Sequence, residues 1–87
     1  MVRIRADVAA KLYERITIAG YRDQFLAAIG ASDSQLRSTL RADAPILDRS
    51  TLNAITSFVQ SKPDLWNDPA VRAMVNCDPS DPFSICG

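Results

Sequence analysis

Apolar residues recur every three or four positions along most of this chain, a spacing that predicts amphipathic helices. Val8, Leu12 and Ile16 lie four residues apart and place an apolar stripe on a first helix over residues 6–19. Gly20 follows directly, and glycine tolerates the positive φ at which many helices end. The first predicted element is therefore an amphipathic helix that Gly20 terminates.

A second, shorter helix is expected over residues 22–29. Phe25, Leu26 and Ile29 share one face of this helix, so that face is expected to pack on the core. Gly30 comes directly afterwards and suits a tight turn, because glycine adopts backbone conformations that other residues avoid. The turn is expected to lead into a third helix.

The third helix, over residues 33–41, has the clearest start signal in the sequence. Ser32 and Gln35 form the S-x-x-Q pattern of a capping box, in which each side chain bonds a backbone N–H group of the first turn. Leu36 and Leu40 lie four residues apart and are expected to point inward.

The segment "ADAP" interrupts this pattern, because Pro45 disfavours a helical conformation at Ala44. Asp48 or Ser50 is then expected to cap a fourth helix that runs to about residue 61. The expected apolar face of this helix consists of Leu52, Ile55, Phe58 and Val59.

A fifth helix is predicted within the segment "LWNDPAVRAMV". Asn67 or Asp68 would cap it, and Pro69 would take the first helical position, where a missing N–H group removes no bond. The apolar residues expected to pack along and before it are Leu65, Trp66, Val71 and Val75.

These elements predict an all-α fold, a compact bundle of about five short helices, because no stretch alternates apolar and polar residues as a strand does. Residues 1–76 form the expected helical domain. Residues 77–87 contain two Asp-Pro steps and no periodicity, so an irregular tail is expected there. The length of 87 residues fits one domain with a modest core.

Cys77 and Cys86 both lie in the tail, and their expected state depends on the compartment. The N-terminal residues mix charged and apolar types, and no apolar run reaches membrane-spanning length, so the cytoplasm is the expected location and no membrane partner is expected. Cytosolic thiols normally stay reduced, which favours free cysteines, whereas an oxidising compartment would allow a disulfide.

The net charge is zero, but the charges are unevenly distributed. Residues 1–50 hold eight Lys or Arg against six acids, whereas residues 51–87 hold two against four. The sequence contains no histidine, glycine-rich phosphate loop or close carboxylate pair on an apolar helix face. We therefore expect neither an enzyme nor a metal site, and no cofactor.

The segment "FLAAIGASDSQLRSTLRADAPILDRSTLNAIT" resembles the heart of a lambda-repressor-like (Cro-like) helix-turn-helix domain. The shared features are a Gly turn, a Ser-capped helix, a Pro-containing loop and a following helix with the pattern "TL..I". The resemblance extends over about residues 8–62. It implies a small DNA-binding transcriptional regulator of phage or bacterial repressor type, which acts as a homodimer on double-stranded DNA.

The resemblance also implies that the helix over residues 33–41 reads DNA, with Leu36 as its buried anchor. Gln35 would pair with adenine, and Arg37 or Arg41 with guanine or phosphate. The residues expected to face DNA are Ser32, Ser34, Gln35, Arg37, Ser38 and Arg41.

Arg3 and Arg5 precede the first helix. They are either an arm that reaches DNA or the solvated start of the chain. The expected homodimer surface is the fifth helix, through Val71, Met74 and Val75, or the tail, through Phe83 and Ile85.

An alternative interpretation stays open. The chain would then be a small helical protein–protein interaction module, such as a phage-encoded inhibitor or adaptor of a host protein. The zero net charge favours it, because phosphate neutralisation supplies much of a DNA binder's affinity. Asp33 also favours it, because an acid in the first turn of the candidate reading helix would repel phosphates.

Overall fold

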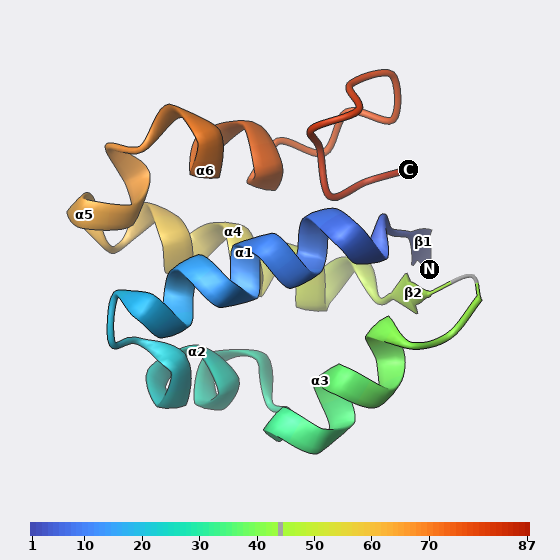
Figure 1. Cartoon of the computed structure of the whole chain (residues 1–87), viewed down its shortest axis with the longest axis horizontal. Helices are drawn as coiled ribbons and strands as arrows, with labels where there is room; N and C mark the ends of the chain where they lie inside the picture. Colours follow the sequence, from blue (N-terminus) through green and yellow to red (C-terminus); the bar gives the residue numbers. More distant parts are fainter. Residues whose placement is uncertain (44) are drawn as a thin grey trace.

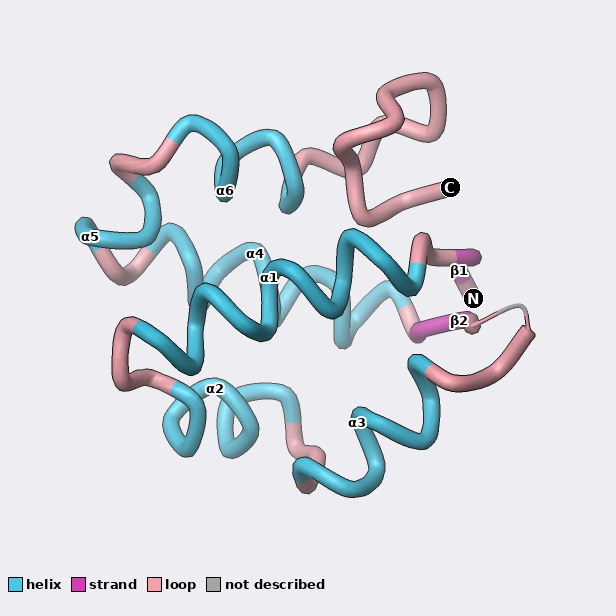
Figure 2. Tube along the Cα trace, in the orientation of Figure 1, coloured by secondary structure: helices cyan, strands magenta, loops and turns pink. Residues whose placement is uncertain are grey.

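The computed structural model describes residues 1–43 and 45–87, and within these residues the chain forms six helices and two short strands (Figures 1 and 2). The helices are α1 Ala6–Ile18, α2 Arg22–Ile29, α3 Asp33–Leu40, α4 Arg49–Gln60, α5 Pro63–Trp66 and α6 Pro69–Val75. The strands are β1 Val2–Arg3 and β2 Ile46–Leu47, which pair antiparallel. The predicted all-α bundle is confirmed, with this small ribbon added.

Helix α1 runs through the middle of the molecule, with α6 on one side, α2 and α3 on the other, and α4 behind it (Figure 1). Its predicted apolar stripe is confirmed, because Val8, Leu12 and Ile16 are all buried. This central position means that α1 separates the candidate DNA-reading helix α3 from α6.

An aromatic cluster joins the helices at the core. The ring of Phe25 on α2 lies between those of Tyr13 on α1 and Phe58 on α4, with ring centroids 5.9 and 5.5 Å away respectively. Such tilted and edge-to-face pairs add to the stabilisation that burial provides. The remaining predicted apolar positions of α4, Leu52, Ile55 and Val59, are buried as expected.

The helix starts after residue 45 differ in part from the prediction. Asp48 occupies the N-cap position of α4, but its side chain makes no capping hydrogen bond, so the expected side-chain cap is missing. Asp68 caps α6 as expected, by accepting a hydrogen bond from the backbone N–H of Ala70 at 2.9 Å. Helix α5 was not predicted, and it forms because Pro63 starts a separate helical turn directly after α4. The expected break at Ala44 lies outside the described residues.

The tail is irregular, as predicted, but the expectation of free cysteines is wrong because Cys77 and Cys86 form a disulfide. Ser84, which is fully buried, organises the closed loop. Its hydroxyl donates to the carbonyl oxygen of Asn76 and accepts from the backbone N–H groups of Asp78 and Cys86 at 3.0 and 3.2 Å. The tail is therefore internally bonded as well as cross-linked.

Arg5 fastens the tail to the start of α1, so both sequence-based interpretations of Arg5 are wrong. Its Nη1 atom donates to the carbonyl oxygens of Asp81, Ser84 and Cys86 at 2.8, 3.2 and 2.5 Å, and its Nη2 atom donates to that of Pro79 at 3.1 Å. Only a forked guanidinium has enough donors in one plane for this arrangement.

Candidate nucleic-acid interface on helix α3

The turn between α2 and α3 depends on Gly30. This residue adopts the left-handed conformation, with φ of 68°, which favours glycine. Its N–H donates to the carbonyl oxygen of Ala27, and the N–H of Ala31 donates to that of Leu26 at 3.1 Å. The predicted glycine turn is confirmed, and it redirects the chain so that α3 begins after Ser32.

The predicted capping box at the start of α3 is also confirmed. The Ser32 hydroxyl accepts a hydrogen bond from the backbone N–H of Gln35 at 3.2 Å, and the Gln35 Oε1 atom accepts one from the backbone N–H of Ser32 at 3.0 Å. The Gln35 side-chain oxygen is thus engaged by the protein itself. A bidentate pair with adenine would need that oxygen as well as the amide nitrogen.

The inner face of α3 is held against α1. Leu36 is buried and Leu40 is half-buried, in agreement with the prediction that both point inward. The Tyr13 hydroxyl on α1 donates to the Oδ1 atom of Asp33 at 2.6 Å. These contacts fix which side of α3 remains exposed.

The Tyr13–Asp33 bond shifts the pKa values of both groups. Burial, followed by the hydrogen bond to Asp33, raises the pKa of Tyr13 to about 12. The Tyr13 hydroxyl, followed by the Arg37 guanidinium, lowers the pKa of the Asp33 carboxyl. Sequence analysis missed this bond, because it depends on how α1 and α3 are placed in space.

The outer face of α3 carries an exposed polar stripe, formed by Ser34, Arg37, Ser38 and Arg41. These residues are spaced three, one and three positions apart, which puts them on one side of a helix. Of the six residues predicted to face DNA, these four form the stripe. The other two, Ser32 and Gln35, are exposed but take part in the capping box.

The arginine at the centre of the stripe is already paired. The Nε atom of Arg37 donates to the two carboxylate oxygens of Asp33 at 3.1 and 2.9 Å. Exposed i,i+4 ion pairs on helices contribute only about 0.3–0.5 kcal/mol. Arg37 can therefore exchange Asp33 for a phosphate at little cost in free energy.

No group of three or more His, Cys, Asp or Glu side chains among the described residues is arranged to hold a metal ion. None of the helices described combines the length and the apolar character that crossing a bilayer requires.

The expected homodimer surface needs correction. Val71, Met74 and Val75 on α6, and Ile85 in the tail, are buried within the single chain. Each is at most 8% exposed, so these side chains offer little surface to a second copy. Phe83 alone among the predicted residues is well exposed, at 70%.

Searches of family models, curated proteins and solved structures return no match to this chain. The resemblance to a helix-turn-helix domain thus rests on the sequence pattern alone.

Proposed function

We propose that this chain is a small transcriptional regulator that contacts double-stranded DNA through the exposed face of α3. The observation that carries the proposal is the polar stripe of Ser34, Arg37, Ser38 and Arg41, on a short helix that follows the Gly30 turn. A helix-turn-helix presents its second helix to the major groove in this way.

Each residue of the stripe has a distinct expected role. Arg37 and Arg41 supply the positive charge and contact phosphate oxygens or the acceptor edge of guanine. Ser34 and Ser38 donate to phosphates from the same face. Ser32 and Gln35 keep the N-terminus of α3 in place through the capping box, so we propose a positioning role for them in place of base contacts.

The charges near α3 support weak binding by a single copy. Within residues 22–43, Arg22, Arg37 and Arg41 are matched by Asp23, Asp33 and Asp43, so this segment has no net charge. Few phosphates can be neutralised by so balanced a segment, and phosphate neutralisation supplies most of nonspecific affinity. Binding should therefore be in the micromolar range, and its slope of log affinity against log salt should be small, at roughly 0.9 for each phosphate contact.

Fluorescence anisotropy of a labelled random-sequence DNA duplex tests the proposal. At low salt, about 50 mM, the protein should saturate the signal at micromolar concentration. The variant Arg37→Ala/Arg41→Ala should lose most of the signal change. Arg72→Ala is the matched control, because Arg72 is an exposed arginine on α6. Helix α6 lies on the other side of α1 from α3 (Figure 1). No binding at tens of micromolar, or equal loss in the control, would contradict the proposal.

Binding to another protein is the second candidate function. Two adjoining surface hollows on α1, α5, α6 and the tail, which do not involve α3, favour this function.

A further inference from the structure

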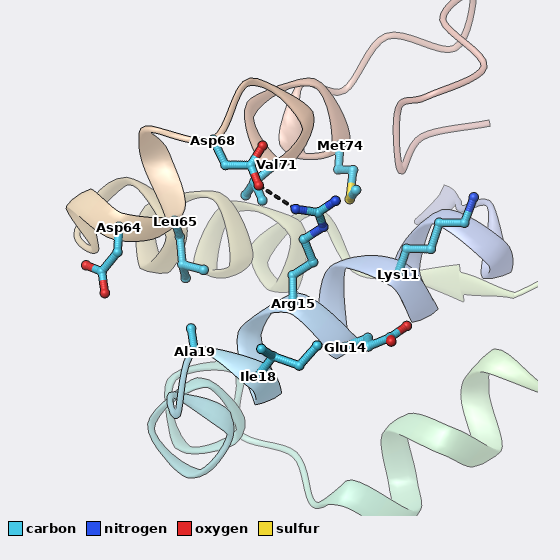
Figure 3. A pocket seen from close by; sticks show the side chains of 10 residues that line it. All are labelled: Lys11, Glu14, Arg15, Ile18, Ala19, Asp64, Leu65, Asp68, Val71 and Met74. Atoms are coloured by element: carbon cyan, nitrogen blue, oxygen red, sulfur yellow. Dashed lines mark hydrogen bonds and ion pairs between the residues drawn. The ribbon is translucent and has the colours of Figure 1, made fainter.

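Helices α1, α5 and α6 border a surface hollow of 460 Å³, on the side of α1 that faces α6 (Figure 3). Its apolar lining includes the buried residues Leu65, Val71 and Met74. Ile18 stands at its margin and is 78% exposed. Half of the lining residues are charged, so the hollow combines apolar and charged surface, as protein interfaces do.

A second hollow, of 550 Å³, lies beside the first, and Val8, Ala73 and Phe83 are among the residues that line it. The two hollows share Lys11, Arg15 and Met74, so they form one continuous feature, which we call the α1–α6 groove. On α1 its lining extends from Asp7 to Ala19, which corresponds to about 18 Å of helix.

An ion pair crosses the middle of the groove and joins its two walls (Figure 3). The Nη1 atom of Arg15 on α1 lies 2.5 Å from the Oδ2 atom of Asp68, while the Oδ1 atom of Asp68 accepts the capping hydrogen bond from Ala70 at the start of α6. One carboxylate thus bonds both α1 and the start of α6.

Each end of the groove has one exposed large apolar side chain. Among the described residues, the large hydrophobic side chains with high exposure are Met1, Ile18, Ile46 and Phe83. Two of these four line the groove, with Ile18 beside the end of α1 and Phe83 beside its start. A ligand that covers both ends would remove them from water together.

The groove carries an excess of negative charge. Its lining has four carboxylates against two cationic groups, so two negative charges are in excess; the charged residues are Asp7, Lys11, Glu14, Arg15, Asp64 and Asp68. The Tyr21 hydroxyl donates to Asp64 at 2.7 Å and lowers the pKa of that carboxyl below its usual value. This charge repels DNA and anionic lipid, and it attracts a cationic ligand.

We infer that the α1–α6 groove binds an amphipathic helical segment of a partner protein, with apolar side chains turned into the groove and Lys or Arg at its margins. The length of about 18 Å accommodates a partner helix of about 12 residues. This inference does not depend on DNA binding, because α3 contributes no residue to the lining of the groove.

Two designed helical peptides of about 12 residues test the inference directly. Both have leucines on one face, at positions i, i+3, i+4 and i+7, and the other positions are lysine-rich in one peptide and glutamate-rich in its match. The lysine peptide should bind the full chain at least about tenfold more tightly, because its charge complements the groove. It should also shift the amide NMR signals of Ile18, Leu65 and Phe83.

Substitutions at the ends of the groove identify the site. Ile18→Ser and Phe83→Ser should each weaken binding of the lysine peptide by about tenfold, as for anchor positions at interfaces. Ile46→Ser is the matched control, because it removes an exposed apolar side chain outside the groove and should leave binding unchanged. Circular dichroism should show that all three variants stay folded.

Several results would overturn the inference. Equal binding of the two peptides would contradict the charge argument, and binding that survives Phe83→Ser and Ile18→Ser would place the peptide elsewhere. Absence of binding at millimolar peptide would also contradict it. Sedimentation equilibrium should show a monomer, and a dimer that Phe83→Ser dissociates would instead assign the groove to a second copy of this chain.

Discussion

Arg37 and Asp33 are paired on the exposed side of α3, with the Nε atom of Arg37 3.1 and 2.9 Å from the two carboxylate oxygens. The same carboxylate accepts a hydrogen bond from Tyr13 at 2.6 Å. Tyr13 thus holds Asp33 close to the core, and Asp33 in turn holds Arg37 close to the start of α3. A phosphate or base that binds Arg37 must compete with Asp33.

The Tyr13–Asp33 bond should be visible in a pH titration. Burial and this bond raise the folded-state pKa of Tyr13 to about 12, above the unfolded value of about 10. The stability that this shift provides is therefore full below about pH 10 and is lost as the pH rises through about 12. We expect Asp33→Asn to lower the midpoint of Tyr13 ionisation, measured by phenolate absorbance in a Tyr21→Phe background. An unchanged midpoint would contradict the bond.

The shift of Asp33 acts in the opposite pH range. The pKa of Asp33 is lower in the folded state than in the unfolded chain, where it is about 3.9. The stability that this shift provides is therefore present above about pH 3.9 and is lost as the pH falls through the folded-state pKa. The stability difference between the parent and Asp33→Asn should accordingly shrink on acidification.

Leu36→Ala should lower the free energy of unfolding by roughly 2–5 kcal/mol, because it removes a buried side chain between α3 and the core. Leu40→Ala should cost less, because Leu40 is only half-buried. Urea denaturation of both variants measures the difference. If Leu36→Ala leaves the midpoint unchanged, α3 does not pack on this face.

Ser32→Ala should cost about 1 kcal/mol of stability, because it removes the capping hydrogen bond to Gln35. Ser38→Ala is the matched control, since Ser38 is an exposed serine on the same helix. The same denaturation experiment compares them. Equal stability of the two variants would show that the capping box does not hold in solution.

Removing the disulfide should cost about 2–3 kcal/mol, because the closed loop restricts the unfolded chain. Cys77→Ala/Cys86→Ala should show this loss in urea denaturation. The parent protein should lose a similar amount when a reductant is added, and the double variant should not respond to the reductant. A parent protein that is insensitive to the reductant would indicate free thiols.

Local signals made the helices predictable. The bounds of α2 and α3 follow from apolar spacing, the glycine at residue 30 and the capping pattern of Ser32 and Gln35, all within a few residues of one another. The same holds for α6, where Asp68 precedes a proline. The polar stripe of α3 was also predictable, because it is the face opposite Leu36.

The tail and the Tyr13–Asp33 bond could not be predicted from local patterns. The carbonyl group of Cys86 meets the side chain of Arg5, 81 positions earlier in the sequence, and Asp33 lies twenty positions from Tyr13. Such pairs are set by the packing of whole helices. The α1–α6 groove likewise combines residues from α1, α5, α6 and the tail, so its acidic excess is not visible in any single segment.

DNA affinity measured across a series of salt concentrations tests the proposed function most directly. Arg37→Ala/Arg41→Ala should keep the parent's melting temperature, because both side chains are exposed. If both arginines contact phosphates, the slope of log affinity against log salt should flatten by about 2, roughly 0.9 for each lost contact. Identical slopes for the parent and the double variant would contradict DNA binding by α3.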